Sequence, residues 1–134
     1  MLLDINHARI VHLEWELKLE ETLQRGRRPL KIVSHHNCML GVWLYTEGLV
    51  KYRQTPEILR LEELHHNFHD LAQQVADAHA EKQPALAQEL FEELQLESRE
   101  IVYLLTLIEL RILRQKRRFH LLRHPLRSLR KLFS

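Results

Sequence analysis

The chain has 134 residues, which suits a single domain, and its formal net charge at pH 7 is only +2. Hydrophobic residues make up 45% of it, with three glycines and four prolines, so we expect a compact helical protein rather than a disordered one. The single cysteine excludes an internal disulfide. The first residues lack a signal-peptide pattern, and no stretch approaches the roughly 18 apolar residues of a membrane-spanning helix, so we expect a cytoplasmic protein.

The charges are divided unequally along the chain. Nine of the 20 Lys and Arg residues, and none of the 18 Asp and Glu residues, lie in 110–134. Residues 1–109 therefore hold 11 basic and 18 acidic residues, a net charge of −7. An acidic body with a basic tail predicts that the tail is an interaction segment.

The first predicted helix covers about 4–24, because apolar residues recur there at spacings of three and four. The stretch 25–29, which contains Gly and Pro, ends it. His12 falls on the apolar side of this helix, three residues before Trp15. The apolar stripe consists of Ile5, Ala8, His12, Trp15, Leu19 and Thr22 or Leu23.

A short second helix is expected over 38–44, after a loop. Ser34 or Asn37 is expected to cap this helix, which should end near Gly48. Glycine has a low helix propensity, so helix formation does not explain Gly41 at this position. A glycine there indicates a close approach of another backbone segment.

Two long helices complete the chain. Thr55-Pro56-Glu57 is typical of a helix start, with a capping residue, Pro at the first position and an acid in the first turn. A break over 82–84 precedes the last helix, which is expected to continue to Arg123, with Pro125 as its stop or kink. The apolar stripes are Ile58, Leu61, His65, Phe68, Ala72, Val75 and His79 in the third helix, and Ala87, Leu90 or Phe91, Leu94, Ser98, Ile101, Leu105, Ile108 and Ile112 in the last.

Three long helices and one short, cysteine-bearing helix, joined by brief connections, predict an all-α fold. An antiparallel, up-down four-helix bundle is its simplest arrangement. A last helix of about 40 residues spans about 60 Å, so its end should project beyond the bundle.

His12, Cys38, His65 and His69 are candidate metal ligands. His65 and His69 are four residues apart, so both lie on one face of a helix, one turn apart. Zinc binds cysteine sulfur and histidine nitrogen readily, and its structural sites are usually four-coordinate. The intervals of 26, 27 and four residues match no local zinc-finger spacing, and a single histidine on an apolar stripe is more often a core residue with its hydrogen bonds satisfied.

Three short motifs occur in order along the chain. The sequence around His12 reads as HxxW, the sequence from Cys38 to Trp43 as Cx[LF]GxW, and the sequence from His65 to His69 as HxxxH. Together they resemble the chemoreceptor zinc-binding (CZB) domain, over roughly residues 4–112.

This resemblance implies a four-helix bundle, a regulatory role without catalysis, and a homodimer. It also implies a zinc (Zn²⁺) site made of His12, Cys38, His65 and His69. The family occurs in bacterial chemoreceptors and diguanylate cyclases, where it reports zinc or oxidants to an output domain. Neither a methyl-accepting segment nor a GGDEF-type cyclase domain follows within these 134 residues, so we expect a stand-alone domain with an unknown signalling partner.

The other histidines are interpreted more simply. His66 is an alternative to His65, but the family pattern favours His65. His35 and His36 are interpreted as solvated loop residues, with a second-shell or exchange role at the metal as the alternative. Trp15 and Trp43 are interpreted as core aromatics that wall the site from water. Structural or exposed positions are expected for His7, His79, His120 and His124.

A closed four-ligand zinc site has no open position for water, so an enzyme is not expected. The leading hypotheses are zinc sensing, in which metal binding ties the helices together, and oxidant sensing through Cys38. The alternative is a non-sensory dimerisation or interaction scaffold with a structural zinc. A di-iron, oxygen-binding bundle of the hemerythrin type is disfavoured, because a thiolate is the wrong ligand for it.

We divide the chain into a zinc-binding bundle, 1–112, and a basic amphipathic tail, 113–134. Apolar and basic residues alternate in the tail at helical spacing. Such a segment docks on a protein partner or on a second copy of the chain, or lies on an anionic membrane surface. Nucleic acid is the least favoured partner, because no recognition motif accompanies the charge. The apolar positions are Leu122, Leu126, Leu129 and Phe133, and the basic ones are Arg123, Arg127, Arg130 and Lys131.

Overall fold

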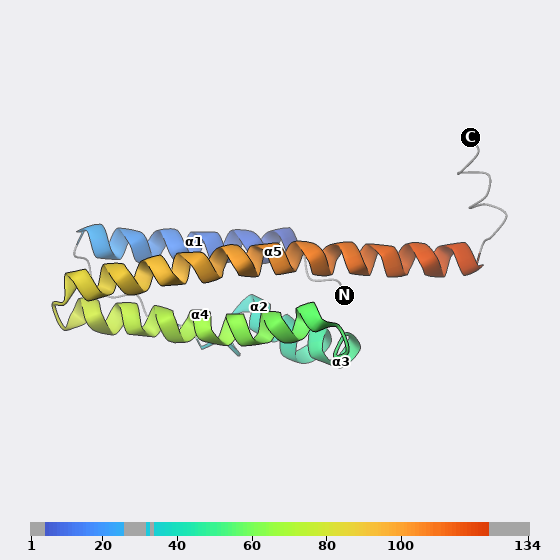
Figure 1. Cartoon of the computed structure of the whole chain (residues 1–134), viewed down its shortest axis with the longest axis horizontal. Coiled ribbons are helices and arrows are strands. Elements are labelled where there is room, and N and C mark those ends of the chain that lie inside the picture. Colours follow the sequence, from blue (N-terminus) through green and yellow to red (C-terminus); the bar gives the residue numbers. More distant parts are fainter. Residues whose placement is uncertain (1–4, 26–31, 33, 124–134) are drawn as a thin grey trace, which may run out of the picture.

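The computed structural model describes residues 5–25, 32 and 34–123, and every regular element in these residues is a helix (Figure 1). Three of the elements, α2, η1 and α3, follow one another without a break, so we call 39–51 the α2–α3 rod. Together with α1, α4 and α5 it gives four helical rods, as predicted. The bounds are α1 Ile5–Arg25, α2 Met39–Trp43, the π-helical turn η1 Leu44–Gly48, α3 Leu49–Lys51, α4 Pro56–Ala80 and α5 Pro84–Arg123.

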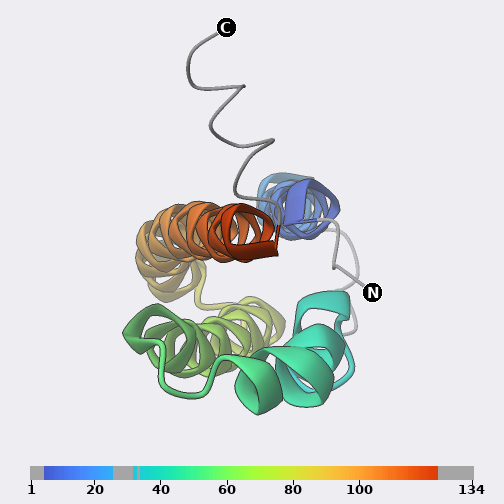
Figure 2. The same ribbon diagram turned by 90° about the vertical axis from the view of Figure 1, so that its right-hand side faces the viewer.

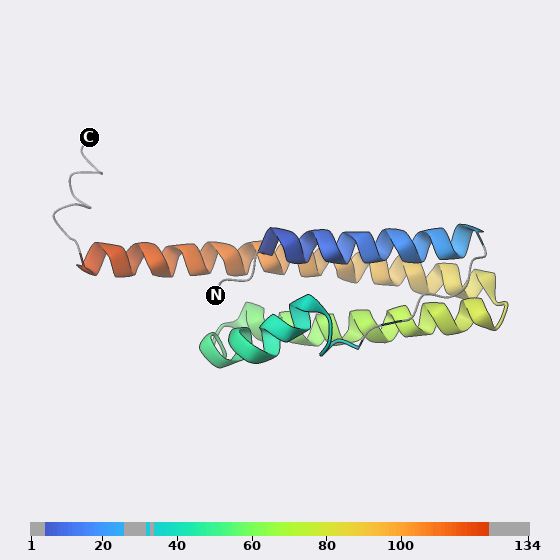
Figure 3. The ribbon, with the colours of Figure 1, turned by 180° about the vertical axis from the view of Figure 1, so that it is seen from behind.

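Successive rods run in opposite directions, so the protein is an antiparallel four-helix bundle. Seen along its length, α5 lies between α1 and α4, and the α2–α3 rod occupies the fourth corner (Figure 2). The view from behind shows α1 side by side with the first half of α5 (Figure 3). This order brings the start of α2 close to both α1 and α4, although these segments are far apart in sequence.

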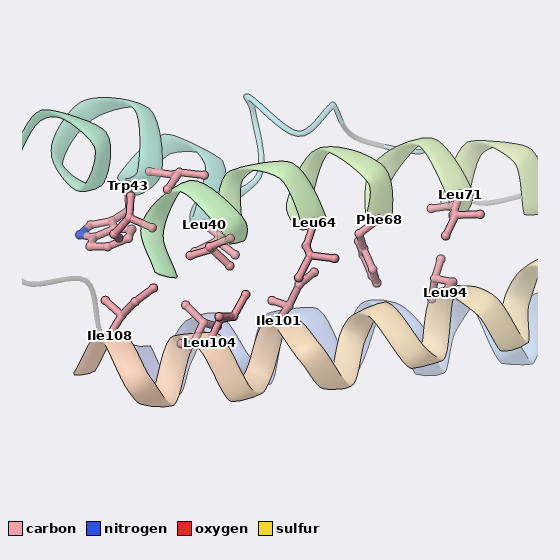
Figure 4. Packing of buried hydrophobic residues seen from close by; sticks show 14 of the residues in the cluster. Leu40, Trp43, Leu64, Phe68, Leu71, Leu94, Ile101, Leu104 and Ile108 are labelled. Atoms are coloured by element: carbon pink, nitrogen blue, oxygen red, sulfur yellow. The ribbon is translucent and has the colours of Figure 1, made fainter. Parts of the chain in front are cut away.

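The hydrophobic core lies mainly between α4 and α5. Leu64, Phe68 and Leu71 of α4 point toward α5, where Leu94 and Ile101 meet them (Figure 4). The predicted apolar stripes of both helices are buried up to Val75 in α4 and Ile112 in α5. Leu40, Trp43 and Leu44 of the α2–α3 rod close the same cluster from the side.

Helix ends agree with their local signals. Thr55 is the N-cap of α4 and Pro56 its first residue, while Lys82, at a positive φ of 58°, turns the chain into α5. The short rod differs from expectation, because it continues past Gly48 to Lys51 through a π-helical turn. A Cβ atom on Gly48 would lie 2.9 Å from the Trp43 ring, so close packing on this indole explains the glycine there.

The helix α5 has 40 residues against 25 in α4, so about 20 Å of it extends beyond the bundle, as predicted (Figure 1). Ile112 is its last buried residue, and the described side chains beyond it are exposed. The predicted stop, Pro125, and three of the four predicted apolar tail positions lie outside the described residues. No helix in the described part is long and apolar enough to cross a membrane.

Candidate metal centre

Cys38 is the N-cap of α2. Its Sγ accepts a hydrogen bond from the Gly41 backbone N–H at 3.3 Å, while its backbone is extended, with φ −75° and ψ 158°. The predicted cap, Ser34 or Asn37, is wrong. Ser34 instead opens the preceding turn, in which its carbonyl accepts from the N–H groups of Asn37 and Cys38 at 3.0 and 3.3 Å.

Gly41 holds this turn against α2. A Cβ atom at this position would lie 1.7 Å from the carbonyl oxygen of His35, which no side chain can tolerate. The predicted close backbone approach is therefore confirmed. It fixes the segment 35–38, and with it the Cys38 thiol, beside α4.

The α4 histidines meet this thiol. His65 Nε2 lies 3.0 Å from Cys38 Sγ and 3.1 Å from His69 Nε2. His65 is fully buried, His69 is 5% exposed, and Cys38 is partly buried. The i,i+4 spacing on one helix thus brings the two imidazoles together, and His65 also meets the sulfur atom of Cys38.

His12 joins the group from α1. Its ring packs on Phe68 at a centroid distance of 5.1 Å and on His65 at 5.4 Å, and it is 4% exposed. One ligand atom each from His12, Cys38 and His65 lies within 4.8 Å of the others. The structure therefore brings together residues of three rods, with His69 Nε2 beside them.

The donor atoms suit a tetrahedral zinc ion. With metal–nitrogen distances of about 2.0 Å and a metal–sulfur distance of about 2.3 Å, the edges of the tetrahedron measure about 3.3 to 3.5 Å. The two edges that meet at His65 Nε2, at 3.0 and 3.1 Å, need only a slight expansion. His69 is not part of the group whose donor atoms all lie within 4.8 Å of one another, so its ring has to move toward Cys38 and His12 to complete the tetrahedron. Nδ1 of His12 and Nδ1 of His65 are both buried with no hydrogen-bond partner among the described residues. A metal ion could satisfy Nδ1 of His12, whereas His65 faces Cys38 and His69 through Nε2, so its Nδ1 would stay unsatisfied.

Burial also sets the protonation states that a metal requires. It lowers the pKa of His12 to about 4, with a further contribution from His69, and the pKa of His65 to about 2, with a further contribution from His12. Both rings are therefore neutral at pH 7 and carry a lone pair. Burial raises the pKa of the Cys38 thiol, against a smaller lowering by the N–H groups of Gly41 and Leu40, so metal binding has to displace its proton.

The site is walled on one side and open on another. Trp15 covers His69 at a ring distance of 5.4 Å, as predicted for a wall, whereas Trp43 belongs to the core beside Gly48. A pocket reaches the metal centre from the surface. It is lined by Val11, His12, Trp15, Asn37, Cys38, Met39 and His69.

The remaining histidines are placed as follows. His7 is exposed and His79 is half-buried, while the side chain of His120 and all of His124 lie outside the described residues. His35 is half-buried and stacks with His36 and His66 on the outer side of the metal centre. No spacing in the sequence indicates this stacking, because the turn that carries His35 is positioned by tertiary contacts.

Comparison with known proteins gives one match. The family model of the chemoreceptor zinc-binding domain matches residues 12–76, which include all four candidate ligands and end before α5. The matched segment is shorter at both ends than the 4–112 that the motifs suggested. No match was found among curated proteins or among solved structures.

Proposed function

We propose that the chain is a zinc-binding sensory domain of the chemoreceptor zinc-binding family, whose model matches residues 12–76, and that His12, Cys38, His65 and His69 form its sensing centre. The observation that carries this proposal is the convergence of Cys38 Sγ and His69 Nε2 on His65 Nε2, at 3.0 and 3.1 Å. Zinc is the ion that this family binds, and sulfur with imidazole nitrogen is the donor set it prefers.

A bound zinc would keep Cys38 as a thiolate and hold α1, the start of α2 and α4 at one point. Polar contacts link α1 to α5, among them an ion pair between Arg9 and Glu109 at 3.9 Å. The Ser98 hydroxyl donates to Glu16 at 3.0 Å, and the Arg9 guanidinium donates to the Thr106 hydroxyl at 2.8 Å. A shift of α1 when His12 gains or loses its metal contact would thus reach α5, which continues without a break into the projecting end.

Zinc availability and oxidation are two stimuli for the same residues. The thiolate of Cys38 borders the pocket, where a peroxide can reach it. Sulfur attacks one peroxide oxygen, the O–O bond breaks, hydroxide leaves, and Cys38 becomes a sulfenic acid. A sulfenic acid is a poorer metal ligand than a thiolate, so oxidation would break the bond between Cys38 and the zinc. Zinc depletion would remove the same bond.

Elemental analysis and competition with a chelator test the proposed centre. We expect untagged protein to hold one zinc per chain, with a dissociation constant below about 1 µM. Cys38→Ala should lose this zinc, whereas His79→Ala, a change at the far end of α4, should keep it. Equal zinc content in wild-type protein and Cys38→Ala would contradict the proposal.

We also propose a homodimer that forms through α1 and α5. Exposed apolar residues follow a heptad spacing on the outer faces of these neighbouring helices, which is typical of helix pairing. A second copy of the chain would cover both stripes at once. These are Ile10, Leu13 and Leu17 on α1, and Leu96, Tyr103 and Leu110 on α5.

The output is assigned to the end of α5. Because Ile112 is the last buried residue among those whose side chains are described, we propose that 1–112 is the sensing unit and that 113–134 is an arm that docks on a signalling partner. A reducing, cytoplasmic environment remains a prediction that suits a reactive thiol. The exposed basic residues of the described part of the arm and of the turn before it are Arg111, Arg114, Lys116, Arg117 and Arg118.

A further inference from the structure

Three histidines form a second cluster, next to the metal centre but on the surface. His35 and His36 lie in the turn before Cys38, and His66 follows the candidate ligand His65 on α4. The His35 ring lies 4.1 Å from the His36 ring and 4.3 Å from the His66 ring, measured between centroids. We call these three residues the outer histidines. His36 and His66 are exposed, and His35 is half-buried.

Asp70 orients the His66 ring for metal binding. His66 Nδ1 lies 3.3 Å from Asp70 Oδ2, one helical turn further along α4. When the ring is neutral and Nδ1 carries the proton, the Nδ1–H group faces this carboxylate. The lone pair then lies on Nε2, where it is available to a metal. Metal-ligating histidines are commonly held in this way by a carboxylate.

Among the outer histidines, His35 has its ring within reach of the metal centre. Its ring centroid is 6.5 Å from that of His65 and 6.4 Å from that of His69. Its backbone carbonyl also lies 3.9 Å from Cys38 Sγ and is held in place by the contact with Gly41. Only the His35 side chain would thus separate a metal ion bound by the outer histidines from the buried donor atoms.

We propose that His35, His36 and His66, with Asp70 orienting His66, form a second divalent-metal site that loads the buried centre. The proposal rests on the function proposed above. Imidazole nitrogen suits zinc and related metals, and three ligands, two of them on exposed side chains, leave room for water, so this site should be weak and exchange quickly. In the structure the His35 ring is tilted by 39° against the His36 ring and meets the His66 ring edge-on, at 74°, so the exposed His36 and His66 have to turn about their side-chain bonds to bind one ion.

Titration with Co²⁺ alone distinguishes the two sites. In untagged wild-type protein, we expect the first equivalent to produce a sulfur-to-cobalt charge-transfer band from Cys38, and a second, weaker equivalent to bind without this band. The double variant His36→Ala, His66→Ala should lose only the second equivalent. His79→Ala serves as the matched control, because it removes an α4 histidine that lies outside both sites.

Loading kinetics test the second half of the proposal. When zinc is supplied from a fluorescent chelator, we expect apoprotein with the double substitution to take it up at least fivefold more slowly, with unchanged final affinity. A retained second equivalent, or an unchanged loading rate, would overturn the proposal. Failure of the proposed function gives a different result, because the sulfur band would then be absent from wild-type protein while the double variant still reports on the outer histidines.

Discussion

Cys38 combines two roles at one atom, because its Sγ caps α2 and also faces the buried histidines. Cys38→Ser keeps a hydrogen-bond acceptor at the cap, whereas Cys38→Ala removes it. In metal-free protein we therefore expect the alanine variant to be about 1 kcal/mol less stable than the serine variant, measured by urea unfolding. Both variants should bind zinc poorly. Equal stability would show that the cap contributes nothing.

Gly41 is the residue with the least tolerance for change. A methyl group there would meet the His35 carbonyl at 1.7 Å, and the turn that carries the thiol would have to move. We expect Gly41→Ala to cost about 3 kcal/mol and to weaken zinc binding, measured by unfolding and by chelator competition. Gly48→Ala, which meets the side chain of Trp43 instead, is the control. If Gly41→Ala behaves like the wild type, the described turn is wrong.

Protonation of the buried rings makes the metal-free protein sensitive to acid. The unfolded chain takes up protons on histidine below about pH 6.5, whereas folded His12 does so only near pH 4 and His65 near pH 2. Stability is therefore lost as the pH falls from about 6.5 toward 4, by up to about 1.4 kcal/mol per pH unit for each ring. Urea midpoints from pH 7.5 to 5 measure this slope. His12→Ala should flatten it, and an equal slope in both proteins would contradict burial of the neutral ring.

At the scale of elements, hydrophobic spacing with Pro and Gly punctuation was enough to predict the long helices. Pro56 and Pro84 each begin a helix, and the stripe through His65 and Phe68 is buried as expected. Hydrophobic spacing does not indicate the π-helical turn or the Cys38 cap, since neither changes which residues face the core.

The same reasoning explains which parts of the site were foreseen. His12 and His65 occupy core-facing positions and sit within short motifs, so sequence patterns identify them. The outer histidines lack such a pattern, because His36 and His66 are 30 residues apart and only the folded turn brings His35 between them. The interpretation of His35 and His36 as solvated loop residues, and of His66 as an alternative to His65, did not include these ring contacts.

The apolar faces of α1 and α5 make the oligomeric state testable. Leu17 is 60% exposed and Tyr103 is 62% exposed, and each lies in a stripe with heptad spacing. We expect the double variant Leu17→Glu, Tyr103→Glu to sediment as a monomer in analytical ultracentrifugation, while the wild type sediments as a dimer. The control is Val50→Glu, an equally drastic change at a 73% exposed residue of α3. A wild-type monomer would contradict the proposed dimer.

At the scale of the whole molecule, an acidic bundle carries a basic helical end. A chain that ends at residue 112 loses no described buried side chain, since Ile112 is the last one. We expect it to keep its zinc and to unfold within about 4 °C of the full chain, a difference of about 1 kcal/mol. A larger fall in calorimetry would show that the arm packs on the bundle.

Co-sedimentation with lipid vesicles distinguishes between a protein partner and an anionic membrane as the binding target of the arm. Docking on a protein partner predicts that the full chain and the chain ending at 112 sediment equally with anionic vesicles. If the full chain sediments more, and salt reverses the difference, the arm binds an anionic membrane surface instead.

X-ray absorption spectroscopy of the zinc-loaded protein tests the proposed ligand set most directly. We expect one sulfur at about 2.3 Å and three nitrogens at about 2.0 Å from the zinc, as required by Cys38 with His12, His65 and His69. Any zinc that Cys38→Ala retains when the metal is in excess should show no sulfur contribution. A zinc ion surrounded only by nitrogen and oxygen in the wild-type protein would contradict the sensing centre proposed here.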